Sequence, residues 1–443
     1  MGVKKRATIG RKSAVRQRVA RIPSPTGPEF WRSPLRGPWL TALLGVVLLA
    51  GITVLIVTGL LSYAAYNPNL APVNDKTPDK GLLGFYLFSW PTHPHWLYRL
   101  TQGVHVTLGV VLVPVLLAKL WSVIPKLFAL PPARSVAHAI ERISLLLLVG
   151  GVLFEFATGV LNVQLDYLFP GSFYPLHFYG AWVFIGAFVA HVVLRFPLAM
   201  RVLRERGLRA PLREPAASQQ EPPDAFGLVA PRPEAPTLSR RGLLGLVGGG
   251  SLLLFVVTAG QSIGGPLRRL ALLAPHGGPE PAAGPHGFQI NKTAHGVGIR
   301  ATDTGDDWRL TVRGPDGRTV RLSRDDLLRL PQHGARLPIA CVEGWSTPDQ
   351  GWSGVRLRDL AALVGAGDRP PGALVRSLQL RGSFRVAALR ANQVRDPRSL
   401  LALRVNGAEL SLDHGHPARI IVPAAPGVLN TKWVASVTFG GLS

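Results

Sequence analysis

The sequence has a single cysteine, Cys341, among 443 residues, and this scarcity excludes two kinds of site. One thiol cannot form an internal disulfide, and without a Cys-x-x-Cys-His motif the chain has no attachment site for c-type haem. Acidic residues are also few, since 25 Asp and Glu stand against 49 Lys and Arg, for a formal charge of +24. A lone cysteine is usually a small buried hydrophobic residue, so its surroundings decide whether it has a chemical role.

The excess of positive charge would indicate nucleic-acid binding if it lay on one soluble domain, but it is divided. Residues 1–36 hold ten Lys and Arg against one acid, and residues 195–241 hold nine against five. Both segments flank long apolar stretches, so the charge is a topology signal under the positive-inside rule. We therefore expect no nucleic-acid partner.

Four apolar stretches within residues 37–206 are each long enough to cross a bilayer. They are Trp39–Leu61, Trp96–Trp121, Val136–Leu161 and Tyr174–Met200. Basic residues cluster before the first stretch and after the second and fourth, which predicts that both ends of this unit face the cytoplasm. The sequence thus predicts a four-helix, cytochrome b-like membrane domain in the cell membrane, preceded by a disordered basic cytoplasmic arm at residues 1–36.

Residues 207–238 are rich in Pro, Ala, Gln and Glu, which is typical of a linker, here a cytoplasmic one. The pair Arg240-Arg241 then precedes a fifth apolar run, so residues 239–264 predict an anchor helix. The pair resembles a twin-arginine export signal, and an ordinary positively flanked membrane helix is the alternative. Export by the twin-arginine translocase, which carries folded domains, would suit an outer domain that takes up its cofactor in the cytoplasm.

The remaining residues, 287–443, follow a Gly/Pro/Ala-rich tether at residues 265–286 and predict an extracytoplasmic α+β domain with a mixed sheet. The expected strands are Trp308–Val312, Val320–Leu322, Leu374–Leu380, Arg419–Val422 and Trp433–Phe439, and the expected helices are Arg324–Leu330 and Leu357–Val364. The whole chain is therefore expected to be multidomain. It would combine an all-α membrane bundle, with four helices plus one anchor helix, and an α+β domain.

Four histidines within the predicted spans pair by depth. His177 and His191 lie fourteen residues apart on one predicted helix, so they share a face and stand about 21 Å apart along its axis. His105 lies in the outer half of the second span, and His138 lies at the inner end of the third. Single intramembrane histidines are often structural, but four that pair by depth are harder to explain in that way. The arrangement resembles bacterial membrane cytochromes b, which implies two b-type haems, one bound by His105 and His177 and one by His138 and His191.

Several polar residues near the spans have roles that the sequence leaves open. His93 and His95 could replace or supplement His105 as a ligand. His138 is flanked by two arginines, so it could lie at the membrane interface. Glu155 could handle protons at a quinone site, or it could hydrogen-bond a neighbouring helix.

Cys341 ends a short apolar run and is followed by Val-Glu-Gly-Trp-Ser, which predicts a thiol where a strand gives way to a loop. The segment resembles the molybdenum-ligand stretch of the sulfite oxidase family, which includes bacterial molybdenum-dependent methionine sulfoxide reductases. The resemblance implies that Cys341 is the metal ligand at the catalytic centre. A soft thiolate suits a high-valent molybdenum centre.

The resemblance covers essentially all of residues 287–443, through several motifs in the family's order. These motifs are Phe288–Ala294, Cys341–Ser346, Trp352–Val355, Asp413–Arg419 and Gly427–Trp433. By position in them, the residues implied as contacts to the molybdopterin and its phosphate are Asn291, His414, Arg419, Asn430, Thr431 and Lys432. Arg and Lys beside a glycine-containing loop are suitable donors to an anion. Arg381 and Arg385 could meet an oxyanion or bind the cofactor.

Together these features predict a membrane-anchored molybdopterin oxidoreductase fused to its own b-type cytochrome. The expected reaction is oxygen-atom transfer at the outer face, on a small oxo-donor or oxo-acceptor, with electrons exchanged with the membrane quinone pool through the haems. Reduction of an S- or N-oxide is favoured, because the cysteine segment resembles the reductases and no dimerisation domain follows it. Sulfite-type oxidation is the alternative. A cofactor-free membrane sensor or scaffold would leave the histidine depths and the Cys341 motif as coincidences.

Overall fold

The structure is a computed structural model that describes residues 24–26, 30–66, 87–128, 135–163, 173–215, 221, 227–275, 284–380 and 384–440. The chain divides into two compact units, which are described separately. The first unit comprises residues 1–50, 113–150 and 186–251, and the second comprises residues 51–112, 151–185 and 252–443. Most of the predicted cytoplasmic arm lies outside the described residues.

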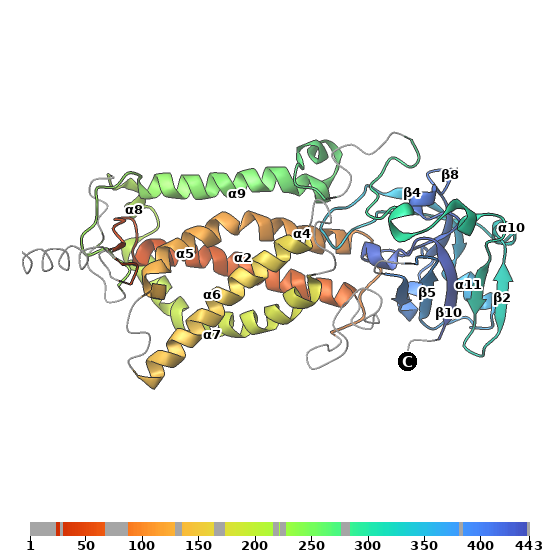
Figure 1. The fold of residues 1–443 in the computed structure, drawn as a ribbon, viewed down its shortest axis with the longest axis horizontal. Coiled ribbons are helices and arrows are strands. Elements are labelled where there is room, and N and C mark those ends of the chain that lie inside the picture. Colours follow the sequence, from red (N-terminus) through yellow and green to blue (C-terminus); the bar gives the residue numbers. More distant parts are fainter. Residues whose placement is uncertain are drawn as a thin grey trace, which may run out of the picture. The chain divides into compact units, whose positions relative to one another are not determined.

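The apolar stretches form long α-helices (Figure 1). These are α2 (Pro38–Tyr66), α4 (Leu97–Val111), α5 (Val113–Phe128), α6 (Val136–Asn162), α7 (Tyr174–Arg206) and α9 (Arg240–Ile263). Within the described residues, α2, α6, α7 and α9 are each long and apolar enough to cross a membrane, and α4 and α5 together would make a fifth span. The predicted number of five apolar spans corresponds to this upper figure.

The second predicted span, Trp96–Trp121, is not one straight helix. Helix α4 ends at Val111, α5 begins at Val113, and the two axes differ by 42°. Pro114 explains the break, because its ring has no N–H to donate to the carbonyl of Val110 and clashes with that group. In the structure this stretch is two helices that meet at Leu112 and together would make one broken span.

The outer domain contains a five-stranded mixed sheet in the order β2-β1-β10-β5-β6. Figure 1 labels β2, β10 and β5 of this sheet. Its strands are β1 (Leu310–Arg313), β2 (Thr319–Leu322), β5 (Ala373–Ser377), β6 (Val386–Leu389) and β10 (Val434–Phe439). β1 and β10 run parallel, and the other neighbours are antiparallel. The predicted mixed sheet is thus confirmed, with strand ends that differ by a few residues.

A second sheet is antiparallel and has the order β3-β4-β7-β8, with β9 also paired to β7. Its strands are β3 (His333–Leu337), β4 (Gln350–Arg356), β7 (Leu400–Val405), β8 (Ala408–Glu409) and β9 (Arg419–Ile421). Of these, the sequence predicts only β9. Strand β4 escapes prediction because two glycines interrupt its apolar pattern. At Gly354 an added Cβ would lie 2.0 Å from the carbonyl oxygen of Leu401, so the close approach of β7 requires glycine there.

Short helices complete the outer domain, namely α10 (Arg324–Arg329), α11 (Leu357–Leu363) and α12 (Ala391–Arg395). The main core joins both sheets with α11 and includes Leu310, Val355, Leu360, Leu401 and Val437, all fully buried. Burial of these aliphatic side chains stabilises the domain. The result is a rigid support for the loops that carry polar residues.

In the first compact unit, Arg240 at the start of α9 is fully buried. Its guanidinium forms ion pairs of 2.7 Å with Glu214 and with Glu221. Glu221 is buried too, and it also pairs with Arg206 at the end of α7. Part of the predicted linker is therefore attached to both helices by a buried ion-pair network, which includes the short helix α8 (Ala210–Arg213) at its edge. Removing one partner of such a network leaves an uncompensated buried charge.

Candidate functional site

Cys341 lies in a tight turn between β3 and β4. Its backbone N–H donates to the carbonyl of Trp345 (2.8 Å), and the N–H of Gly344 donates back to the carbonyl of Cys341 (3.1 Å). Gly344 has a φ of +89°, a conformation in which glycine is favoured. The thiol residue is 4% exposed. The structure therefore places Cys341 where the sequence predicts it, in a loop held by strands.

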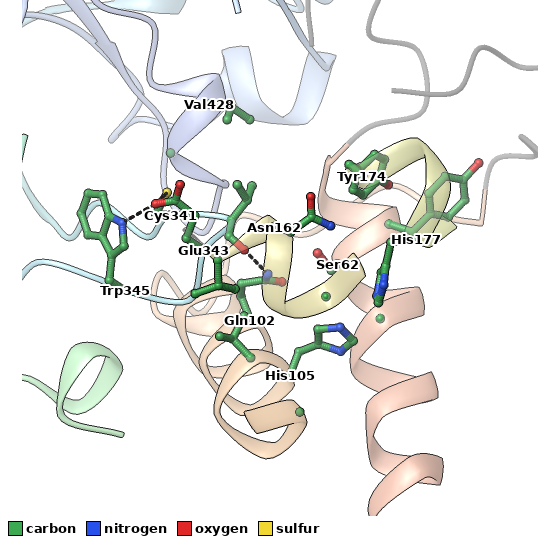
Figure 2. A pocket seen from close by; sticks show the side chains of 18 of the residues that line it. Ser62, Gln102, His105, Asn162, Tyr174, His177, Cys341, Glu343, Trp345 and Val428 are labelled. Carbon is green, nitrogen blue, oxygen red and sulfur yellow. Dashed lines mark hydrogen bonds between the residues drawn. The ribbon is translucent and has the colours of Figure 1, made fainter. Parts of the chain in front are cut away.

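The thiol of Cys341 stands next to a carboxylate. Its Sγ lies 3.5 Å from Oε2 of Glu343, and the same oxygen accepts a hydrogen bond from Nε1 of Trp345 at 2.9 Å (Figure 2). Burial, and then the negative charge of Glu343, raise the pKa of the Cys341 thiol well above its ordinary value. A metal cation would reverse this effect, because a coordinated thiol loses its proton.

Three cationic side chains gather near the thiol in the same domain: Lys292, Arg419 and Lys432. Burial lowers the pKa of Arg419 to about 9 and that of Lys292 to about 8. Burial and the nearby charges of Arg419 and Lys292 lower the pKa of Lys432 well below its usual range. Like charges oppose one another's ionisation in this way, and Asp413 offsets the effect at Lys432 only in part. The cluster therefore fits an anionic ligand.

Unused donors point to the same kind of ligand. Among the described residues, three buried polar atoms of this cluster have no hydrogen-bond partner: Nε of Arg419, Nδ2 of Asn430 and Oγ1 of Thr431. The amide of Asn430 is fixed, because its Oδ1 accepts from the N–H of Val422 at 2.9 Å. Such donors cost stability unless a ligand with many acceptors reaches them. A phosphate-bearing pterin is a ligand of this kind, and these residues fit it.

The other two predicted contacts, Asn291 and His414, line the same cavity as the cations, but the ring of His414 is already hydrogen-bonded. Both ring nitrogens of His414 already have partners, since Nδ1 lies 2.8 Å from Oγ of Ser411 and Nε2 lies 3.3 Å from the carbonyl oxygen of Phe288. Burial, followed by Arg419, lowers the pKa of His414 to about 4. The ring of His414 is therefore neutral. Because both its nitrogens have hydrogen-bond partners, it mainly supports this part of the cavity wall rather than donating a hydrogen bond to a ligand.

Two histidines of the apolar helices face each other. The ring centroids of His105 on α4 and His177 on α7 are 6.3 Å apart, and their planes are 84° apart (Figure 2). The structure thus brings together the two residues that the sequence pairs as outer ligands. Both rings also line the cavity described below, so a ligand in that cavity could contact both of them.

Each of these histidines has hydrogen-bond partners at Nδ1. For His105 they are Oγ1 of Thr58 (3.0 Å) and the carbonyl of Leu55 (3.1 Å). For His177 they are Oγ1 of Thr158 (3.0 Å) and the carboxylate of Glu155 (3.1 Å). A partner at Nδ1 orients the ring and leaves Nε2 available to a metal.

The threonines belong to a repeated dipeptide that the sequence analysis missed. Thr58-Gly59 lies on α2, and Thr158-Gly159 lies on α6. An added Cβ at Gly59 would lie 3.2 Å from Cε1 of His105, and one at Gly159 would lie 3.3 Å from Cε1 of the facing histidine. Glycine thus permits each ring to lie close to the helix. The available signal was the recurrence of Thr-Gly in the first and third spans. Lys292 was also missed, although it directly follows Asn291.

For the predicted inner ligands, His138 and His191, no ring-to-ring distance of this kind can be given. The side chain of His138 lies outside the described residues. His191 lies on α7 in the first compact unit. The assignment of a second haem to these residues stays a prediction.

The other polar residues whose roles the sequence leaves open either have partners away from the thiol or lie outside the described residues. His93 lies 3.3 Å from Asp396, and His95 lies 3.4 Å from Asp349, so both contact carboxylates of the outer domain and do not replace His105. Glu155 contacts a residue of a neighbouring helix, which is one of the two roles considered for it. Arg381 lies outside the described residues, and the carbonyl of Arg385 accepts from the N–H of Ser377 at 2.8 Å.

One cavity of about 670 Å³ within the second compact unit is lined by both sets of residues. The sequence-predicted residues in its wall are Asn291, Cys341, His414, Arg419, Asn430, Thr431, Lys432, His105 and His177. Apolar side chains such as Leu60, Phe156, Phe178 and Ile185 line the helical part. Cys341 and the two histidines thus belong to the lining of the same cavity (Figure 2).

Known proteins resemble the outer domain. Residues 297–441 match the family model described as "Oxidoreductase molybdopterin binding domain". Mitochondrial sulfite oxidase of Rattus norvegicus is 32% identical over 158 residues, which cover 30% of this chain and 29% of that protein. The protein-methionine-sulfoxide reductase catalytic subunit MsrP of Gluconobacter oxydans (strain 621H) is 30% identical over 147 residues, 29% of this chain and 46% of that protein.

Among solved structures, the sulfane dehydrogenase SoxCD from Paracoccus pantotrophus matches 30% of this chain and 38% of that chain, at 23% identity and a TM-score of 0.28. The chain spans less than half the length of the two curated relatives named above. The family match begins at residue 297, after α9, and supports a molybdopterin-binding domain that contains Cys341, Arg419 and Lys432.

Proposed function

We propose that this chain, whose residues 297–441 form a molybdopterin-binding domain of an oxidoreductase, exchanges electrons between a molybdenum site at Cys341 and a b-type haem in its own membrane helices. The observation that carries this proposal is the single cavity lined by Cys341, the cation cluster and the facing rings of His105 and His177. A cofactor-free sensor or scaffold would leave this clustering of buried cations beside a buried thiol without a function.

The residues around Cys341 have distinct tasks when the cofactor is bound. Molybdenum would supply two-electron oxygen-atom transfer, with the Cys341 thiolate as its protein ligand. Metal binding would release the thiol proton, and Oε2 of Glu343, held by Trp345 and 3.5 Å from the sulfur, is placed to accept it. Arg419 and Lys432 would hold the phosphate of the pterin, and the unused donors of Asn430 and Thr431 would orient it.

His105 on α4 and His177 on α7 would hold the haem iron from two different helices, and their ring centroids lie 6.3 Å apart. The partners at each Nδ1 would hold the rings with Nε2 toward the iron, and the two Thr-Gly pairs leave room for the rings. These features support one haem at the outer side.

The proposed direction is reduction of a small S- or N-oxide, with electrons drawn from the membrane quinone pool. The Cys341 segment favours a reductase, and one of the relatives named above is a methionine-sulfoxide reductase. Sulfite-type oxidation, with electrons passed inward, is the second candidate, since another relative is a sulfite oxidase. In both cases residues 287–443 would lie outside the cytoplasm and the N-terminus inside.

The purified full-length chain tests this function. We expect it to contain molybdenum and a haem that dithionite reduces to a low-spin b-type spectrum. Mixing the reduced protein with sulfoxides and N-oxides, and the oxidised protein with sulfite, should identify the compound that changes the haem redox state. A preparation that is well folded but has no reducible haem absorption would support the scaffold instead.

The export hypothesis makes a separate prediction. Replacing both Arg240 and Arg241 with lysine keeps the charge, so the four-helix unit should insert normally, but a translocase that reads guanidinium pairs should leave residues 287–443 in the cytoplasm. Because Arg240 also holds buried ion pairs whereas Arg241 is exposed, Arg241→Lys is the sharper variant. Protease added outside intact spheroplasts should digest the outer domain of the wild type and leave that of Arg241→Lys intact.

Arg240→Lys is compared with Arg241→Lys to separate an effect on the buried ion-pair network from an effect on export. A folding defect should lower the amount of the four-helix unit in the membrane, whereas loss of the export signal should not. Equal digestion of the outer domain in the wild type and in Arg241→Lys would contradict the export hypothesis, and the cofactor assignments would be unaffected.

A further inference from the structure

Helix α4 carries side chains that reach both parts of the cavity. His105 faces His177, and Gln102 lies three residues earlier on the same face of the helix, at a rise of about 4.5 Å. Gln102 is buried, and its Nε2 donates a hydrogen bond to the carbonyl oxygen of Val342, the residue after Cys341 (Figure 2). One turn of α4 thus carries both His105, the proposed haem ligand, and Gln102, which holds the loop of the proposed metal ligand Cys341.

A second contact brings the Cys341 loop close to the same helix. An added Cβ at Gly344 would lie 2.7 Å from Cβ of Val106, so a larger residue there would push the loop away from α4. The end of α9 holds the other side of the loop. Oγ of Ser262 donates to the carbonyl of Gly344, and the carbonyl of Gln261 accepts from the N–H of Ser346 at 3.0 Å. The loop is therefore held between two helices.

The amide of Gln102 is used for one interaction. Its Oε1 is buried and, within the described part of the chain, has no hydrogen-bond partner. An unsatisfied buried acceptor costs stability that an apolar side chain of similar length would avoid. The feature that sets glutamine apart from such a side chain here is the hydrogen bond that it donates to Val342.

From these contacts we propose that Gln102 is a positioning residue for electron transfer. It holds the Cys341 loop at a fixed distance from α4, so that electrons pass directly between the two cofactors in this cavity, with no separate carrier protein. The inference rests on the proposed function. In the proposed direction, a sulfoxide takes up two electrons and two protons to give a thioether and water. A haem held by His105 and His177 would supply these electrons one at a time, and it would take up an electron from the quinone pool between the two transfers.

The experiment follows electron redistribution inside the full-length protein after a flash-reduced flavin has donated one electron, with haem absorbance as the signal. Gln102→Met keeps the size of the side chain but cannot donate. Loss of one net hydrogen bond shifts the equilibrium between the held and the released loop about fivefold toward release, and the transfer rate should fall with the held population. Gln102→Glu should be slow at high pH, where a carboxylate cannot donate to Val342, and should recover at low pH, where the protonated acid can. Val104→Ala, an exposed position on the same helix, should have no effect.

A second measurement reports distance without any turnover. In a half-reduced sample, the molybdenum EPR signal should relax faster when the haem is ferric, and this enhancement should weaken in Gln102→Met. Haem and molybdenum contents, measured on every variant, show whether both sites are filled. If Gln102→Met fails to fold, the pH dependence of Gln102→Glu decides alone.

Wild-type rates in both Gln102 variants, or a slow rate in Gln102→Glu that does not respond to pH, would overturn the positioning role. Absence of relaxation enhancement in a wild-type protein that contains both cofactors would overturn direct transfer. A wild-type protein that lacks haem or molybdenum would instead contradict the proposed function itself.

Discussion

Cys341→Ser is expected to abolish turnover and release the metal, with the haem spectrum unchanged. Serine is close to cysteine in size, so the buried turn should still form, but its hard oxygen is a poor ligand for a centre that a soft thiolate stabilises. The haem spectrum should survive, because His105 and His177 lie on helices whereas Cys341 lies in the outer domain. Metal analysis, a turnover assay and a reduced-minus-oxidised spectrum on the same preparation measure all three.

Ser346→Ala is the matched control for this variant. Ser346 lies in the same turn, and its Oγ donates to the carbonyl of Ser262 at 3.1 Å, so the variant disturbs the loop without touching the thiol. It should keep its molybdenum and most of its activity. Normal turnover in Cys341→Ser would exclude Cys341 as the metal ligand.

The position of the thiol was predictable because local chemistry determines it. An apolar run followed by Glu-Gly-Trp-Ser specifies a strand end and a turn, and the turn closes through its own backbone at Cys341 and Trp345. The strands around it were less predictable. In β4 the residues Gly351 and Gly354 conceal the alternation of buried positions, and Gly354 is explained only by a neighbouring strand. Sequence periodicity carries no information about that neighbour.

The histidine pair likewise combines a feature that the sequence predicts with contacts that it does not predict. Depth along a helix follows from rise and period, so His105 and His177 could be matched from the sequence alone. The contacts of Thr58 and Thr158 could not, because they depend on which helices are adjacent. The hydrogen bond from Gln102 to Val342 joins residues 240 positions apart. The burial of Arg240 likewise depends on carboxylates of a segment that looks like a plain linker.

His105→Ala and His177→Ala are each expected to remove the same haem and most of its absorbance. The proposal assigns both rings, whose centroids lie 6.3 Å apart, to one haem, so loss of either would leave that haem without one of its two protein ligands. The double variant should therefore lose no more absorbance than either single variant. His191→Ala should affect a different part of the spectrum, since that residue lies in the other compact unit and is assigned to the inner haem.

His93→Ala provides the control, because this histidine contacts Asp396 of the outer domain and does not line the cavity. It should keep its full haem content. Haem is quantified per protein in dithionite-reduced membranes and again after purification, so that a fall in expression is not mistaken for a loss of ligand. If His105→Ala and His177→Ala both retain full haem, the ligand assignment is wrong. If they remove absorbance additively, each histidine serves its own haem, and the facing pair is not a shared site.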